Sequence, residues 1–284
     1  MGGHYIGKGF RRQNPKINRT RYVIPGAEPS DATRNPDQIT VLVFLESPSF
    51  PDVWILHATF YILHNMKLLA LDTATEACSA ALFIDGNIIS RYEVAPRRHT
   101  ELILPMIDQL LAEAETRLAQ LDAIAFGCGP GAFTGVRIAT GIAQGLAFSS
   151  GLPVIPVSTL ATLAQSVRDE TDYIAAAIDA RMDEIYFGLY KSGEYVELIN
   201  VESVLPPADL PVQDISTCYG VGSGWSRYSE LLQDKFKNKL TGYSGDRFPH
   251  AKDMVPLAIH AYKAGALVKP EEAMPVYLRN KVTG

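Results

Sequence analysis

The chain has 284 residues, of which 47% are hydrophobic, and a formal net charge of −5. This length and hydrophobic content suffice for one large domain or two small ones, and the acidic balance argues against a broad basic surface for nucleic acid. The three cysteines, Cys78, Cys128 and Cys218, are far apart and form no CxxC pair. The sequence therefore indicates neither a disulfide framework nor a cysteine zinc site, and it fits a reducing cytoplasm.

Residues 1–65 differ in composition from the rest of the chain. They are polar, basic and proline-bearing, and their two apolar runs, Ile39–Leu45 and Trp54–Leu63, are shorter than the roughly 18 residues of a membrane helix. No charged stretch leads directly into an apolar core, as it would in a signal peptide. We expect the functional protein to start at Met66. Residues 1–65 would then be an extension, either disordered or a misassigned start; a membrane-associated or regulatory arm is the alternative.

From Met66 onward, apolar runs and turn signals alternate regularly. Asp72 ends the first strand, and Asp85-Gly86-Asn87 forms a hairpin turn between the next two. The predicted elements are strands at Lys67–Leu71, Cys78–Ile84 and Ile88–Val94, a helix at Thr100–Arg117, and a strand at Ala123–Phe126.

A glycine-rich turn follows, from Gly127 to Gly135, and leads into a helix over Thr134–Ser150. Gly129 and Gly131 allow backbone angles that other residues avoid, and Thr134 is placed to cap the helix. Such a turn can bind an anion, often a phosphate, at the helix start. A tight strand-to-helix turn without a ligand is an equally good interpretation of the glycines alone.

The helix over Thr134–Ser150 has two apolar faces instead of one. Large and small core-type residues share one face: Val136, Ala139, Ala143, Leu146 and Ala147. The opposite face is nearly free of bulk and comprises Thr134, Ile138, Gly141, Gly145 and Ser149. Because a surface helix normally has a single apolar stripe, we expect the second face to contact another part of the chain or a partner protein. The helix over Thr100–Arg117 is also apolar over too wide an arc for one core.

The second half of the chain repeats the pattern of the first. Ser158 is predicted to cap a helix that runs to about Arg168, and a strand ending at Asp179 is followed by a charged turn, Ala180–Glu184. The pattern strand, Asp, short turn, strand therefore occurs twice, which predicts two related subdomains, residues 66–168 and 169–284. The remaining predicted elements are strands at Val154–Val157, Tyr173–Ile178 and Ile185–Lys191, a second glycine turn at Gly220–Gly224, and helices at Ser226–Lys235 and Asp253–Ala266.

Few side chains suggest chemistry by their position. Asp72 and Asp179 each end a first strand, where acids of duplicated α/β folds often face metal-bound phosphate, but each could also cap its own turn. A metal site on the following helix would need a second histidine four residues after His99, and that position is Ile103. We therefore expect a structural role for His99.

Several segments together resemble the TsaB (YeaZ) family. They are LDTATEACSAAL, HTELILPMIDQLL, GCGPGAFTGVRIATGIAQGLA, IDARMDEIYFGLY and PVYLRN, spread from Met66 to about Val282, whereas residues 1–65 have no counterpart. The resemblance implies an α/β fold of the ASKHA type, that of actin, Hsp70 and sugar kinases, with a duplicated ribonuclease-H-like subdomain. It also implies a part in making N6-threonylcarbamoyladenosine in tRNA, as the non-catalytic partner of TsaD.

The same resemblance implies a partner surface and no catalytic residue. The surface would be Leu102, Met106, Leu110, Thr134, Ile138, Gly141, Ile142 and Gly145, and it would bind TsaD, or a second copy of the chain when TsaD is absent. TsaE would join the complex, tRNA would be reached through it, and no membrane would be involved. The chain would have no cofactor or metal of its own. ATP or ADP would bind in the assembled complex, with Asp72, Gly129, Gly131 and Thr134 as vestigial or interfacial contacts. An ATP-dependent phosphotransferase and a metallopeptidase of this superfamily are the rival functions.

Overall fold

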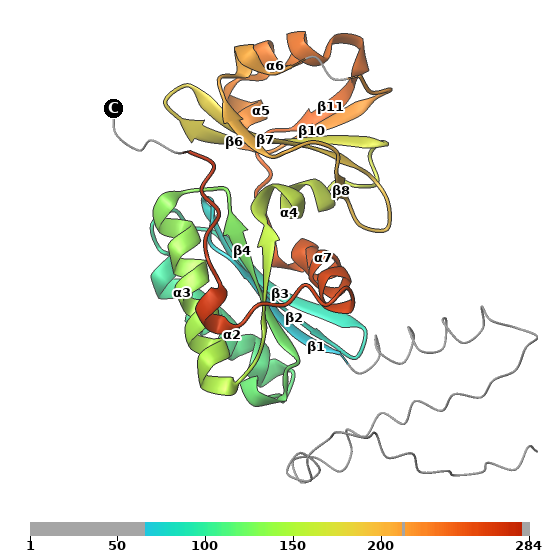
Figure 1. The fold of residues 1–284 in the computed structure, drawn as a ribbon. Helices are drawn as coiled ribbons and strands as arrows, with labels where there is room; N and C mark the ends of the chain where they lie inside the picture. Colours follow the sequence, from blue (N-terminus) through green and yellow to red (C-terminus); the bar gives the residue numbers. More distant parts are fainter. Residues whose placement is uncertain (1–65, 212–213, 280–284) are drawn as a thin grey trace, which may run out of the picture. The chain divides into compact units, whose positions relative to one another are not determined.

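The computed structural model describes residues 66–211 and 214–279, so the predictions for residues 1–65 lie outside the described part of the chain. The first of two β-sheets (Figure 1) has the order β3-β2-β1-β4-β5. Its strands are β1 (Lys67–Asp72), β2 (Ala77–Ile84), β3 (Asn87–Val94), β4 (Ala123–Gly129) and β5 (Val154–Ser158). β2 is antiparallel to both of its neighbours, while β1, β4 and β5 are parallel.

Helices cover both faces of this first sheet. α2 (His99–Glu113) and α3 (Phe133–Ser150) pack on one face, and α7 (Ala251–Lys263) packs on the other. Alternate residues of β1 therefore enter different cores: Leu69 and Leu71 lie under α2 and α3, whereas Leu68 and Ala70 lie under α7. A strand that is buried on both faces needs a continuous apolar run, which explains the sequence LLAL.

The second sheet repeats the strand pattern of the first. Its order is β11-β10-β6-β7-β8, with β9 also paired to β7. β6 is antiparallel to β7 and parallel to β10, as β1 is to β2 and β4. The strands are β6 (Tyr173–Arg181), β7 (Glu184–Lys191), β8 (Glu197–Leu198), β9 (Ser203–Leu205), β10 (Cys218–Val221) and β11 (Leu240–Ser244). The prediction of a duplicated α/β fold of the ASKHA type is confirmed.

The two halves of the chain exchange one helix each. α4 (Thr159–Gln165) follows the first sheet in the sequence, but its Leu160 and Leu163 pack against β6 of the second sheet. Conversely, Met254 and Val255 of α7 follow the second sheet and pack against the first. A single cut between residues 168 and 169 therefore separates the two sheets but not the two cores.

Several helix bounds differ from those predicted. α2 ends at Glu113, because Glu115 adopts a positive φ of 47°, and the segment to Arg117 is not helical. The helix predicted over Ser226–Lys235 is two helices, α5 (Ser223–Arg227) and α6 (Ser229–Phe236). The Ser158 cap is confirmed, since its Oγ accepts a hydrogen bond from Ala161 N at 3.2 Å. Short 3-10 helices occupy Leu118–Gln120, Pro207–Asp209, Lys237–Lys239 and Pro270–Glu272.

Candidate partner surface and glycine turn

On the side away from the first sheet, α3 has an exposed surface that lacks side-chain bulk at Gly141 and Gly145. Val136, Ala139, Ala143 and Ala147 are buried against the first core. On the opposite side Gly141 and Gly145 are exposed, and a Cβ added to either would meet no atom of the described chain within 4 Å, the helix's own backbone aside. The described chain therefore leaves this face uncovered.

The predicted interface residues fall into three groups. Thr134, Gly141 and Gly145 are exposed, and Leu102, Ile138 and Ile142 are partly buried at the edge of the first core. Met106 and Leu110 are 7% and 0% exposed, so their prediction as surface residues is wrong. They face the sheet, because the side of α2 that carries Ile103 and Ile107 is its core side.

Two exposed apolar residues, one on this face of α3 and one on α2, were missed by the sequence analysis. Phe148 is 81% exposed and lies three residues after Gly145, and Leu104 of α2 is 45% exposed. The spacing of Phe148 from Gly141 and Gly145 placed it on the same face of α3, so the helical period could have identified it.

The glycine turn packs tightly on the connection between β1 and β2. A Cβ at Gly127 would overlap the Asp72 carboxylate, and one at Gly131 would overlap the Ala74 carbonyl oxygen. Ala132 N donates a hydrogen bond to Ala74 O at 2.7 Å, which holds the turn in this position. Gly129 has a φ of 104°, which favours glycine. These contacts account for the glycines without a ligand. Thr134 lies inside α3 and not at its cap, because the N-cap is Ala132, so that prediction is wrong.

Asp72 is buried at the end of β1 and is 1% exposed. Its Oδ1 accepts a hydrogen bond from Ala74 N at 2.9 Å, so the residue does cap its own turn. Its Oδ2 has no hydrogen-bond partner in the described chain. Burial raises the pKa of Asp72 to about 7, against the smaller opposing effect of the Ala74 hydrogen bond. Ionising a buried carboxyl of this kind costs free energy. Buried groups with shifted pKa values and unsatisfied polar atoms are concentrated at functional sites.

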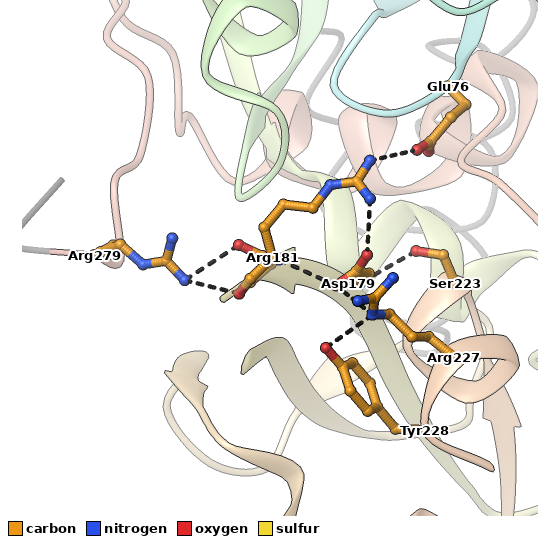
Figure 2. A network of polar contacts seen from close by, with 8 residues as sticks. Glu76, Asp179, Arg181, Ser223, Arg227, Tyr228 and Arg279 are labelled. Atoms are coloured by element: carbon orange, nitrogen blue, oxygen red, sulfur yellow. Dashed lines mark hydrogen bonds and ion pairs between the residues drawn. The ribbon is translucent and has the colours of Figure 1, made fainter. Parts of the chain in front are cut away.

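Asp179, the counterpart of Asp72, lies among arginines (Figure 2). Its carboxylate accepts hydrogen bonds from Arg181 N at 3.0 Å and from the Arg181 guanidinium at 3.2 Å, and Arg227 lies 3.7 Å away. Asp179 therefore also caps its own turn.

The turn after Asp179 has an unusual backbone. Arg181, Met182 and Asp183 are consecutive and have φ values of 62°, 55° and 58°. A left-handed conformation costs a non-glycine residue about 1–2 kcal/mol, so the surrounding structure has to hold this turn. Arg279 does so, because it donates hydrogen bonds to the carbonyl oxygens of Ala180 at 3.1 Å and of Arg181 at 3.4 Å (Figure 2). It also donates a hydrogen bond to Glu184. The sequence predicted a charged turn here and did not indicate the role of Arg279.

His99 has the structural role that was predicted for it. The residue is buried at the start of α2, and its Nε2 lies 2.8 Å from Thr75 O, to which it donates a hydrogen bond. Among the residues that the structure describes, no three His, Cys, Asp or Glu side chains lie together as metal ligands would. No described helix is long and apolar enough to cross a membrane.

Comparisons with known proteins agree with the fold. A model of the family described as TsaD, tRNA N6-adenosine threonylcarbamoyltransferase, matches residues 87–272, more than half of the chain. The TsaB proteins of Haemophilus influenzae and Escherichia coli, named as tRNA threonylcarbamoyladenosine biosynthesis proteins, are each 43% identical to the chain. These matches cover 78% and 76% of this chain and 97% and 96% of the relatives.

A solved structure gives the same result. YeaZ from Pseudomonas aeruginosa is 47% identical, with a TM-score of 0.71, and the match covers 75% of this chain and all of that one. The chain therefore belongs to the TsaB (YeaZ) family.

Proposed function

We propose that the chain is the non-catalytic subunit that pairs with TsaD in the synthesis of N6-threonylcarbamoyladenosine in tRNA, beside the anticodon. The observation that carries the proposal is the α3 face at Gly141 and Gly145, where both glycines are exposed and no atom of another element lies near their Cβ positions. A helix interior tolerates two glycines poorly, at a cost of about 1 kcal/mol each. A partner backbone that approaches closely gives a reason for them.

The partner surface that we propose combines α3 and the outer side of α2. Its members are Leu102, Thr134, Ile138, Gly141, Ile142, Gly145 and Phe148. Its exposed Phe148 gives it an apolar side chain of the kind on which protein interfaces depend. TsaD binds there, a second copy of the chain binds there when TsaD is absent, and TsaE joins the assembled complex.

We assign the transfer chemistry to TsaD and no catalytic residue to this chain. ATP or ADP binds in the assembled complex and not to the lone chain, a proposal supported by the close packing of Gly127 and Gly131 against Asp72 and Ala74. The net charge of −5 argues against a broad basic surface for nucleic acid, which supports the proposal that tRNA is reached through the complex. Because tRNA is modified in the cytoplasm, we place the chain there.

The test is co-expression of the full chain with TsaD from the same organism. We expect a stable complex on size-exclusion chromatography, and synthesis of threonylcarbamoyladenosine in vitro that requires both proteins. Failure of the two to bind, or full synthesis by TsaD without this chain, would contradict the proposal. ATP hydrolysis or phosphoryl transfer by the lone chain would instead favour the phosphotransferase alternative.

A further inference from the structure

We call the first sheet with its covering helices the first lobe, and the second sheet with its helices the second lobe. The C-terminal segment, residues 273–279, lies along the first lobe beside α3 (Figure 1). Ala273 is fully buried in the first core, and its carbonyl oxygen accepts a hydrogen bond from Gln144 Nε2 of α3 at 2.9 Å. Val276 N donates to Cys128 O at the end of β4 at 2.7 Å. The segment is therefore attached to both the middle of α3 and the start of the glycine turn.

The same segment also holds the first turn of α3. Arg137 Nε donates a hydrogen bond to the Tyr277 hydroxyl at 2.7 Å. The guanidinium carbon of Arg137 lies 3.7 Å from the centroid of the Phe133 ring, and the Phe133 and Tyr277 rings are 5.9 Å apart. Arg137 therefore combines a cation–π contact with the Phe133 ring and a directional hydrogen bond to the Tyr277 hydroxyl.

The segment ends on the second lobe, at the left-handed turn of residues 181–183. Arg279 donates hydrogen bonds to Ala180 O at 3.1 Å and Arg181 O at 3.4 Å (Figure 2). It also forms an ion pair with Glu184. Its side chain is only 18% exposed, so these bonds are shielded from water. From the other side, Arg181 reaches Glu76 in the β1–β2 turn of the first lobe at 3.6 Å.

We propose that residues 273–279 form an interlobe strap, which couples the turn at residues 180–184 to the first turn of α3 and so prepares the α3 face for its partner. A run of three left-handed non-glycine residues does not hold itself, and Arg279 supplies the missing support. Loss of Arg279 releases the turn and removes the far anchor of the strap, which loosens the Tyr277–Arg137–Phe133 contact. The effect of the strap on partner binding, which we call the partner half of the inference, rests on the proposed function. The coupling within the chain does not.

The coupling is tested on the full chain alone by amide hydrogen exchange. Arg279→Ala should raise exchange about tenfold or more at residues 180–184, at the Val276 amide and at residues 136–140, because local opening sets these rates. Arg227→Ala is the matched control: Arg227 contacts Asp179 and Tyr228 in the same network but not the strap. It should leave residues 136–140 within about twofold of the wild type. Unchanged exchange at residues 136–140 in Arg279→Ala overturns the coupling.

A second variant keeps the test decisive if Arg279→Ala fails to fold. Tyr277→Phe removes only the hydroxyl that Arg137 contacts and leaves the Arg279 anchor in place. It should raise exchange at residues 136–140 and leave residues 180–184 unchanged. If the exchange rate at residues 136–140 does not rise in Tyr277→Phe, the strap is contradicted.

The partner half is tested by titrating the same variants with TsaD. Arg279→Ala should weaken binding about fivefold or more, while Arg227→Ala should stay within about twofold of the wild type. If the wild-type chain does not bind TsaD at all, the proposed function fails and the exchange result still decides the strap. If the wild type binds and Arg279→Ala binds equally well, the proposed function stands and the effect of the strap on the partner surface is refuted.

Discussion

At the scale of single residues, Asp72 makes the stability of the chain depend on pH. Its pKa is raised from 3.8 to about 7 by burial, so the folded state holds this proton in a range where the unfolded state has lost it. Stability therefore falls as pH rises from about 4 to 7, by an amount on the order of a few kcal/mol. We expect Asp72→Asn to raise the melting temperature at pH 8 and to raise it by a clearly smaller amount at pH 5, where only part of the loss of stability has occurred. Asp85→Asn, at an exposed hairpin position, is the control that should show no such difference. Equal effects of Asp72→Asn at both pH values would contradict the prediction.

His250 gives stability the opposite dependence on pH. Burial, assisted by Lys252, lowers its pKa from 6.5 to about 4, and its Nδ1 accepts the hydrogen bond from Lys252 N that caps α7. As pH falls, the unfolded state takes up this proton before the folded state does. The contribution of neutral His250 to the stability of the fold is therefore present above pH 6.5 and is lost as pH falls towards 4. His250→Asn keeps a capping acceptor that cannot be protonated, and we expect it to flatten the fall in melting temperature over this range. An NMR titration that finds the imidazole protonating near pH 6.5 would show the prediction to be wrong.

At the scale of elements, α3 permits a sharp test of the partner surface. Because Gly145 is exposed with space around its Cβ position, Gly145→Leu should leave the folded chain intact. Within a close interface the added bulk costs about 1–3 kcal/mol, or roughly 5- to 150-fold in affinity. We expect at least about tenfold weaker binding to TsaD, and weaker self-association, by calorimetry and sedimentation. Glu230→Leu, an exposed apolar substitution on α6, should change neither. If Gly145→Leu unfolds the chain, or leaves both associations unchanged, the surface lies elsewhere.

The elements also show what the sequence could and could not predict. The 3.6-residue period and the lack of bulk at Gly141 and Gly145 separated the two faces of α3 correctly. The same reasoning failed on α2, because an apolar arc does not say which leucines face the core: Leu110 does and Leu104 does not. The role of Arg279 was out of reach, since a contact with Ala180 joins residues about a hundred positions apart.

At the scale of the whole molecule, residues 66–279 contain both sheets and all the helices that cover them in the described structure. The TsaB relatives match about three quarters of the chain over nearly their full length. We therefore expect the Met66–Gly284 fragment to bind TsaD as tightly as the full chain and to melt within a few degrees of it. Loss of binding or of function in cells by the fragment would give residues 1–65 a necessary role.

The exchange of helices between the halves has a consequence during synthesis on the ribosome. The first sheet is complete once Ser158 has emerged, but α7, which covers one of its faces, begins roughly ninety residues later at Ala251. At a synthesis rate of about 5–20 residues per second, the apolar side chains of Leu68, Ala70 and Phe83 remain uncovered by α7 for roughly 5–20 s. The nascent chain thus offers a chaperone a defined target, which disappears when the last helix docks.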